Sequence, residues 1–368
     1  MNKLAIILAG GSGKRFWPIS NSAIPEQFVP LIHNSTLFQK SVELISNVFD
    51  KNNRYLVIHK NFKELAISQT ESIIAENVFV EPLAKQTAPA LGLALTLIDD
   101  KYDDDTIICV FPCDQLIKNS DEYYDAIDIA CKTAKKLDAL VTIGIQPDRP
   151  VTNFGYIQFA DAIDDKKNEK IPQELFNKGV RKSISFAEKP DFETAKRFIN
   201  SGDFVWNSGI LVAKKNVLKA NFQQFLNYNY EKIRNIKELF GSEQYFEELE
   251  NTYKTFNKIS IDYGILENAN NIYVVKGSFS WAEISSWHEL HRAELKDALD
   301  NVLQGDVIAI NTTNSFAISN EKLVAIMGLD DVVVVNTEKA ILVCKKSESN
   351  NIEELINFIK NSKMSGYY

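Results

Sequence analysis

The sequence LAGGSGKRFWPIS, residues 8–20, follows directly on the apolar run LAIIL of residues 4–8. An apolar run of this length that ends in glycines predicts a buried strand followed by a tight turn. Glycines let the backbone approach a ligand closely, and successive backbone N–H groups in such a turn form a concave anion site. The two cations that follow can bind phosphate oxygens. We therefore predict a phosphate-binding loop made of Gly10, Gly11, Gly13, Lys14 and Arg15.

The spacing within this loop excludes two common phosphate-binding motifs. A Walker loop carries Gly-Lys followed by Ser or Thr, whereas Lys14 is followed by Arg15. A dinucleotide-binding fingerprint needs a third glycine three residues after the second, and that position, counted from Gly13, is Phe16. The loop therefore predicts neither a P-loop protein nor a dinucleotide-binding protein.

The composition is that of a large acidic protein. The chain has 368 residues, of which 45% are hydrophobic, and a formal net charge of −8. This length is enough for a large core and for about two domains. The acidic balance argues against a nucleic-acid partner. A polyanionic substrate would have to be met by local cations and a metal ion rather than by the field of the whole protein.

The sequence carries no sign of export or of a membrane span. Its four cysteines lack the paired spacing of a metal site, and Cys109 and Cys113 lie on or beside one predicted strand, so we expect buried thiols there. The N-terminal apolar run is too short for a secretory signal, and no stretch approaches the length of a transmembrane helix. We expect a cytoplasmic protein with no membrane partner.

Strands and helices alternate through the first half of the chain. The expected strands cover residues 4–9, 54–59, 78–80, 106–111 and 140–145. The expected helices cover residues 36–47, 63–74, 88–99 and 122–136. This alternation predicts an α/β domain with a mostly parallel, Rossmann-like sheet. Ligands of such sheets bind beyond the carboxyl ends of the strands, where residues 10–15 and 112–114 both lie.

The second half of the chain is less regular. We expect helices over 192–200 and 216–250, and an exposed polar loop or hairpin tip over 161–178. After Leu303 short β runs recur about every eight or nine residues, which predicts a β-solenoid or a small sandwich. A closing helix over 352–359 has one apolar face, which we expect to pack on its own domain. We expect a catalytic domain over 1–290 and a C-terminal β-solenoid-like domain over 291–368.

Asp114 stands at the end of the predicted central strand, after Phe111-Pro112-Cys113. An aspartate in this place can hold Mg²⁺ beside a triphosphate. The alternative is an aspartate that caps a loop, which is common after strands. The glycine loop at the end of another strand favours the metal role.

The pattern Gly-Gly-x-Gly-x-Arg-x-Trp-Pro resembles the signature loop of the sugar nucleotidyltransferases, which join a nucleoside triphosphate to a sugar 1-phosphate. The pair Trp17-Pro18 and the tail Pro25-x-Gln27-Phe28 look like the mannose-1-phosphate guanylyltransferase branch. The resemblance extends from Leu4 to about Val343 with its motifs in order. It implies a nucleotidyltransferase fold, GTP and mannose 1-phosphate as substrates, Mg²⁺ as the metal, and a homodimer.

The resemblance also implies roles for residues in matching motifs. It places Glu81 and Thr87 in the nucleotide pocket, although Gln86 replaces an asparagine of the family there. It assigns Asn207, Glu188 and the Gly155 backbone to the sugar, and Lys189 to the sugar phosphate. It makes Asp114 and Glu283 the magnesium ligands. From its place before an apolar helix, Thr87 is expected to cap that helix and to direct backbone N–H groups at a ligand, the alternative being an ordinary helix start. Taken alone, Glu188–Lys189 could be a solvated surface pair.

Three further positions depart from the family pattern. Gln115 replaces a histidine, and Glu283 replaces the second metal aspartate, for which glutamate is an adequate ligand. Glu26 replaces a lysine that faces phosphate in the family. A carboxylate near a triphosphate repels it, so Lys14 would take over part of that role and Glu26→Lys would tighten GTP. The alternatives are an exposed Glu26 paired with Lys14 or Arg15, neutral in effect, or a Glu26 that positions Lys14.

The resemblance implies transfer of GMP from GTP to α-D-mannose 1-phosphate, and we expect Lys14, Arg15 and Asp114 to be the catalytic residues. The second pKa of a sugar phosphate lies near ~6, so the nucleophile is already ionised and needs no general base. Catalysis would then consist of alignment and charge neutralisation. The alternatives are another sugar-1-phosphate nucleotidyltransferase and a catalytically weak relative that senses a nucleotide.

Overall fold

The computed structural model describes residues 2–11, 13–32, 34–162 and 165–367, and these form two compact units. Unit 1 consists of Met1–Gly10, Val42–Cys113 and Ile117–Ser280. Unit 2 consists of Gly11–Ser41, Asp114–Leu116 and Trp281–Tyr368. The chain therefore passes between the units inside the glycine loop, directly before Asp114, and two residues before Glu283. The domain boundary expected between residues 290 and 291 divides the chain once along its sequence, whereas each of these units combines three separate segments. That boundary stays a prediction.

Unit 1 is built on one large sheet in the order β3-β2-β1-β4-β9-β6-β10-β8-β7. Its strands are β1 (Lys3–Leu8), β2 (Arg54–His59), β3 (Val78–Glu81), β4 (Ile107–Pro112), β6 (Leu140–Ile145), β7 (Gly155–Phe159), β8 (Val180–Glu188), β9 (Phe204–Lys214) and β10 (Ile272–Gly277). Strands β9 and β8 run opposite to the others. The expectation of a mostly parallel sheet is confirmed.

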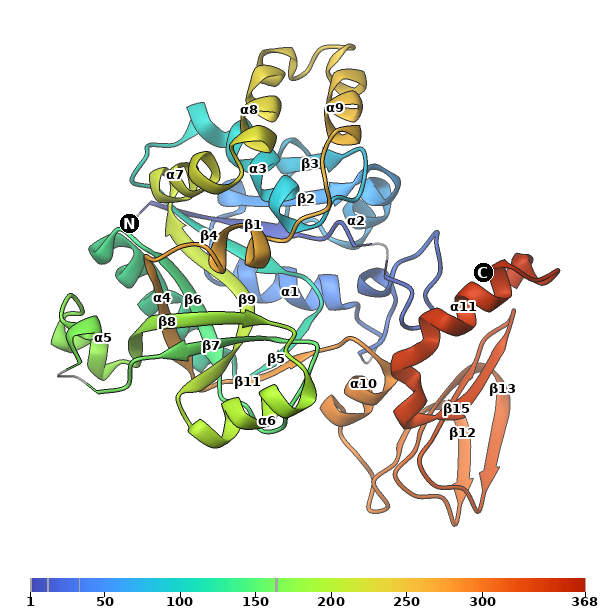
Figure 1. Cartoon of the computed structure of the whole chain (residues 1–368). Helices are drawn as coiled ribbons and strands as arrows, with labels where there is room; N and C mark the ends of the chain where they lie inside the picture. Colours follow the sequence, from blue (N-terminus) through green and yellow to red (C-terminus); the bar gives the residue numbers. More distant parts are fainter. Residues whose placement is uncertain (1, 12, 33, 163–164, 368) are drawn as a thin grey trace. The chain divides into compact units, whose positions relative to one another are not determined.

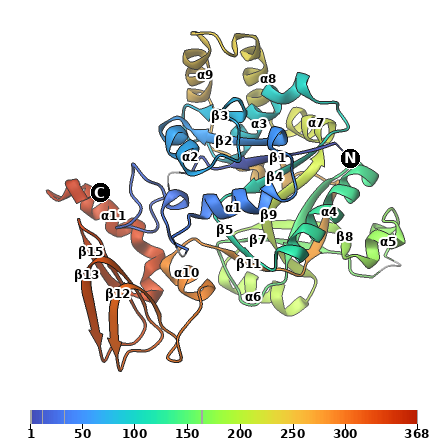
Figure 2. The same cartoon turned by 180° about the vertical axis from the view of Figure 1, so that it is seen from behind.

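Helices cover both faces of this sheet. Leu4 and Ile6 of β1 pack, with alternate residues of β2 and β4, into one apolar cluster. The helices of that cluster are α3 (Thr87–Ile98), α7 (Lys215–Phe225), α8 (Asn227–Asn235) and α9 (Tyr245–Lys254) (Figure 1). Cys109 of β4 points to the other face, where its Sγ lies 3.5 Å from Sγ of Cys131 in α4 (Ser120–Leu137), the helix at the front of Figure 2.

One expectation for the middle of unit 1 is wrong. The single helix expected over 216–250 is three helices, α7, α8 and α9. The chain breaks out of helical geometry at Leu226 and again before α9, where Gly241 has φ +87°. The stretch 161–178 connects β7 to its antiparallel partner β8, as the hairpin alternative predicts, and it contains the short helix α5 (Gln173–Asn177), in which Leu175 is buried; residues 163–164 lie outside the described ranges. The other helices in the first 280 residues are α1 (Leu37–Ser46), α2 (Lys63–Gln69) and α6 (Phe192–Ser201).

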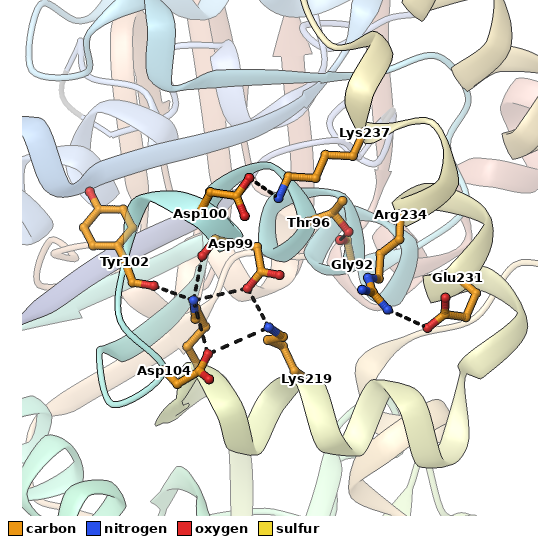
Figure 3. A network of polar contacts seen from close by, with 11 residues as sticks. Gly92, Thr96, Asp99, Asp100, Tyr102, Asp104, Lys219, Glu231, Arg234 and Lys237 are labelled. Atoms are coloured by element: carbon orange, nitrogen blue, oxygen red, sulfur yellow. Dashed lines mark hydrogen bonds and ion pairs between the residues drawn. The ribbon is translucent and has the colours of Figure 1, made fainter.

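A charged network ties α7 to the end of α3 (Figure 3). The Lys215 side chain is buried, and its Nζ donates to the Asp99 carbonyl at 2.7 Å and to the Tyr102 carbonyl. Asp99 also pairs with Lys219 at 2.7 Å, and Asp104 lies 3.3 Å from Lys215. Because every charge here has an opposite partner, the network serves to hold two helices together and does not suggest a ligand.

Unit 2 contains a small β-helix-like sheet in the order β12-β13-β14-β15. Its strands are β12 (Val302–Ile310), β13 (Phe316–Met327), β14 (Val332–Asn336) and β15 (Ile341–Lys345). The first three pair in parallel with their neighbours and β15 is antiparallel, so the solenoid alternative is the one observed.

The closing helix α11 (Ile352–Lys360) packs within unit 2, as expected. Ile352, Ile356 and Ile359 are buried in a cluster with Phe16 and Trp17 of the N-terminal segment and with α10 (Trp287–Ala293), whereas Leu355 is 38% exposed. Trp287 Nε1 donates to the Trp17 carbonyl at 3.3 Å. In the described ranges, no helix is both long enough and apolar enough to cross a membrane.

Candidate functional site

In unit 2 the glycine loop is closed by the carboxylate of Glu26. Arg15 donates to Glu26 Oε1 from Nε at 2.9 Å and from Nη2 at 2.6 Å, and its backbone N–H donates to Oε2 at 3.0 Å. Glu26 begins the short helix η1 (Glu26–Phe28) and is only 2% exposed. Its backbone N–H donates to the Gly13 carbonyl at 3.0 Å. The segment that follows the loop therefore fixes the loop's shape.

Gly13 is glycine because Glu26 fills the space of its side chain. A Cβ at Gly13 would lie 2.3 Å from Cγ and 2.7 Å from Oε1 of Glu26. The neighbouring Gln27 donates from Nε2 to the Gly11 carbonyl at 2.8 Å. The expectation of an exposed Glu26 is wrong, and so is the expectation that its charge acts unopposed, because Arg15 neutralises it inside the fold.

The pKa values of this pair reflect both burial and neighbouring charges. Burial raises the pKa of Glu26, and the Arg15 guanidinium opposes that shift. Burial alone would lower the pKa of Arg15, but Glu26, Asp114 and Glu283 together raise it above its ordinary value. The expected metal ligands therefore lie close enough to Arg15 to act on its charge.

Asp114 and Glu283 are held on neighbouring backbone segments. Asp114 directly precedes β5 (Gln115–Lys118), Glu283 ends β11 (Ser280–Glu283), and these strands form a two-stranded sheet. The Ile284 N–H donates to the Asp114 carbonyl at 3.0 Å. Within the described ranges, no group of three or more His, Cys, Asp or Glu could hold a metal. Mg²⁺ typically takes one or two carboxylates and completes its shell with water and phosphate oxygens, so this pair fits Mg²⁺.

In unit 1 Glu81, which is expected to contact the nucleotide, is buried at the end of β3. Its side chain is 3% exposed, and within the described residues its Oε1 has no hydrogen-bond partner. Burial raises the pKa of Glu81 to about 8, although a hydrogen bond with Tyr253 works against the shift. A Cβ at Gly10 would lie 2.9 Å from Glu81 Oε2, so glycine lets the chain pass this carboxyl. An unsatisfied buried carboxyl oxygen is suited to accept from a ligand N–H.

Thr87 lies at the start of α3 but does not cap it. Its hydroxyl accepts from the Ile261 N–H at 2.9 Å, and the residue at the N-cap position is Gln86, whose side chain makes no capping bond. The expectation of a Thr87 cap is therefore wrong. The hydroxyl instead links α3 to the segment that carries Asp262.

The sugar-side residues also gather within unit 1. Gly155 and Glu188 are partners in the β7–β8 register, and a Cβ at Gly155 would lie 2.6 Å from Glu188 Oε2. Lys189 has a left-handed backbone with φ +50°, its Nζ lies 3.5 Å from Glu188 Oε1, and its side chain is 56% exposed. Its ammonium is therefore available to an anion, and Gly155 is required to make room for Glu188.

The sequence motifs did not identify the residues that orient Asn207. Its Nδ2 donates to Asp262 Oδ1 at 2.9 Å, and its Oδ1 accepts from the Thr142 hydroxyl at 2.7 Å. Burial raises the pKa of Glu188 to about 7, with Asp262 adding to the shift and Lys189 opposing it. Asp262 lies in the run Ser260-Ile261-Asp262-Tyr263, but nothing in that run alone pairs it with Asn207.

The raised pKa of Glu81 predicts a pH dependence of stability. The folded state holds this proton up to about pH 8, whereas the unfolded chain releases it near the ordinary value of 4.5. Because the folded state binds more protons between these values, its free energy of unfolding falls as pH rises from about 5 to 8. Glu81→Gln cannot ionise, so we expect it to lack this part of the fall and to be more stable at pH 8 by on the order of 2–4 kcal/mol.

Urea unfolding of both proteins at pH 5 and pH 8 measures this difference. Glu76→Gln, at an exposed position, serves as the control. If wild type and Glu81→Gln lost the same stability between the two pH values, Glu81 would not carry the proton.

Comparison with known proteins gives matches over nearly the whole chain. The model of the family described as Nucleotidyl transferase matches residues 4–300, and that of the MannoseP isomerase/GMP-like beta-helix domain matches residues 305–358. The chain is 29% identical over 367 residues to mannose-1-phosphate guanylyltransferases of Klebsiella pneumoniae and Escherichia coli, covering 99% of this chain and 75% of each relative.

A solved structure shares the same fold. It is described as mannose-1-phosphate geranyltransferase from Thermus thermophilus and is 26% identical, with a TM-score of 0.85 over 98% of this chain and 100% of that chain. These similarities confirm the resemblance and the fold class expected from the sequence. They do not assign individual residues, so the site roles stay predictions supported by the geometry above.

Proposed function

The chain belongs to the nucleotidyl transferase family, and from that premise we propose that it transfers GMP from GTP to α-D-mannose 1-phosphate, releasing pyrophosphate. The observation that carries this proposal is the near-full-length similarity to enzymes of that name, together with phosphate and sugar motifs in the family's order. In this reaction a sugar phosphate oxygen attacks the α-phosphorus in line with the departing pyrophosphate. The new P–O bond forms as the bond to pyrophosphate breaks.

We assign the triphosphate to the loop held by Glu26. The backbone of Gly11 and Gly13 offers N–H groups, and Lys14 and Arg15 offer charge. Asp114 and Glu283 are the residues that would hold Mg²⁺, which when bound neutralises phosphate charge. Gly10, Glu81 and Thr87 are assigned to the nucleotide, with the unsatisfied Oε1 of Glu81 as an acceptor for a base N–H.

The sugar phosphate is assigned to the residues around Asn207. Asp262 and Thr142 fix both ends of the Asn207 amide, which leaves one Nδ2 hydrogen for a sugar hydroxyl. The exposed ammonium of Lys189 suits a phosphate as a compact point charge. Glu188 can accept from a sugar hydroxyl in its ionised form. None of these residues has to remove a proton from the nucleophile.

A single assay separates this function from its alternatives. Purified protein with Mg²⁺, GTP and mannose 1-phosphate should release pyrophosphate, and exchange of GTP for UTP, ATP or dTTP, or of mannose for glucose 1-phosphate, should reduce the rate. Faster turnover with another pair would identify a different sugar-1-phosphate nucleotidyltransferase. Nucleotide binding without turnover would identify a sensing relative.

Lys189→Ala should weaken the binding of mannose 1-phosphate far more than the binding of GTP. A desolvated, charge-assisted contact contributes about 1.5–3 kcal/mol, so the KM for mannose 1-phosphate should rise roughly 10- to 100-fold. Lys196→Ala, at an exposed position on α6, is the control. Equal changes in both KM values would place Lys189 outside the sugar-phosphate contact.

The setting of the reaction is also a proposal. A cytoplasmic location is supported by the four cysteines, none of which forms a disulfide. A homodimer is proposed on the resemblance alone, and sedimentation of the purified protein would test it.

A further inference from the structure

The Arg15–Glu26 pair leaves one edge of the guanidinium unused. Nε and Nη2 both donate to Glu26 Oε1, whereas Nη1 donates no hydrogen bond to any described residue. The Arg15 side chain is 36% exposed, while that of Glu26 is 3% exposed. One edge of the guanidinium is therefore fixed by a buried carboxylate, and the other remains available to a ligand.

We propose that Glu26 is a positioning residue, which holds Arg15 in one orientation before nucleotide binds and leaves the second edge of its guanidinium for a phosphate oxygen. The proposal rests on the triphosphate assignment made above. It replaces the view of Glu26 as a misplaced negative charge in a phosphate site.

The position of Glu26 is itself firmly determined. Its side chain fills the space beside Gly13, and its backbone is bonded to the Gly13 carbonyl. A second bond runs from the Arg15 backbone N–H to Oε2, so the carboxylate fixes both the loop and the side chain it carries. A carboxylate held this way cannot turn toward a ligand without breaking three hydrogen bonds.

Preorganisation of Arg15 should strengthen binding. A free arginine side chain loses conformational entropy when a ligand immobilises it. Glu26 removes most of that freedom in advance, so less is lost when phosphate binds. Asp114 and Glu283 also attract the guanidinium, and without Glu26 they would compete for it.

A positioning role and simple repulsion predict opposite changes in GTP affinity for Glu26→Gln. If Glu26 acts by repelling the triphosphate, Glu26→Gln should lower the Kd for GTP. If it acts through Arg15, Glu26→Gln should weaken GTP, because a neutral amide holds the guanidinium less firmly. The two views also differ in whether the effect depends on the presence of Arg15.

The test is a double-mutant cycle on GTP affinity, measured by calorimetry with Mg²⁺ present and no sugar phosphate. We expect Glu26→Gln to raise the Kd for GTP about tenfold, and to have no further effect in an Arg15→Ala background. Arg15→Lys keeps the positive charge, but a lysine cannot make the same set of hydrogen bonds to Glu26. This variant should therefore also raise the Kd for GTP. Glu76→Gln serves as the control.

Each outcome is informative. Tighter binding by Glu26→Gln, or an equal effect with and without Arg15, would overturn the proposal. A Glu26→Gln variant that fails to fold leaves Arg15→Lys to decide: wild-type affinity in that variant would overturn the proposal, since charge alone would then suffice. A wild type that binds GTP but releases no pyrophosphate would refute the proposed activity while the cycle still reports on Glu26. A wild type that binds no GTP would refute both.

Discussion

Asp114→Asn is expected to reduce turnover by on the order of a hundredfold or more while the fold stays intact. Asp114 and Glu283 are the two carboxylates placed on paired backbone segments beside Arg15. Replacing one charged oxygen by an amide leaves the triphosphate poorly neutralised, since Mg²⁺ favours anionic oxygen ligands. The backbone carbonyl of Asp114, which accepts from Ile284, is unaffected by the substitution.

The measurement is pyrophosphate release at saturating substrates over a range of Mg²⁺ concentrations. Asp121→Asn, at an exposed position on α4, controls for loss of a surface charge. Thermal unfolding of both variants separates a lost ligand from a lost fold. Near-normal, magnesium-dependent turnover in Asp114→Asn would remove this residue from the site.

Local patterns predicted the parallel part of the sheet well. The apolar runs that became β1 and β4 are long, β-branched and bounded by turns, so both strands and their ends could be placed. The reversed direction of β9 could not be predicted from the sequence, because side chains alternate in the same way in either direction. Only the pairing with β4 and β6 sets the direction of this strand. The breaks between α7, α8 and α9 were also missed: the first, at Leu226, carries no glycine or proline signal, whereas Gly241 marks the second.

The sequence points to the motifs of the candidate site but does not show how their side chains pair. Pairing of Glu26 with Arg15 was one of the expected alternatives and is observed, yet the burial of Glu26 was not expected, because it depends on how residues 25–28 return against the loop. Threonine is favoured at N-cap positions, yet the Thr87 hydroxyl accepts a hydrogen bond from the N–H of Ile261, which is distant in sequence. Such contacts follow from tertiary packing, which local composition does not encode.

Glu26→Lys should destabilise the protein by on the order of 3–5 kcal/mol and abolish GTP binding, although it restores the lysine of the family pattern. The site is 2% exposed and is built around a carboxylate that accepts three hydrogen bonds from Arg15. A lysine there would be a second buried cation against the guanidinium, and the Arg15 backbone N–H would lose its acceptor. The structure therefore reverses the expectation that this substitution tightens GTP.

Urea unfolding of wild type, Glu26→Gln and Glu26→Lys tests this order of stability, with Glu76→Lys as the control for an added surface cation. Glu26→Gln keeps the shape and some hydrogen bonding, so it should lie between the other two. The double variant Arg15→Glu with Glu26→Lys restores opposite charges and should recover part of the stability. This double variant should not recover GTP binding, because its positive charge would lie at the buried position 26 instead of on the loop at position 15. A Glu26→Lys protein as stable as wild type, with tighter GTP, would show that Arg15 does not need this carboxylate.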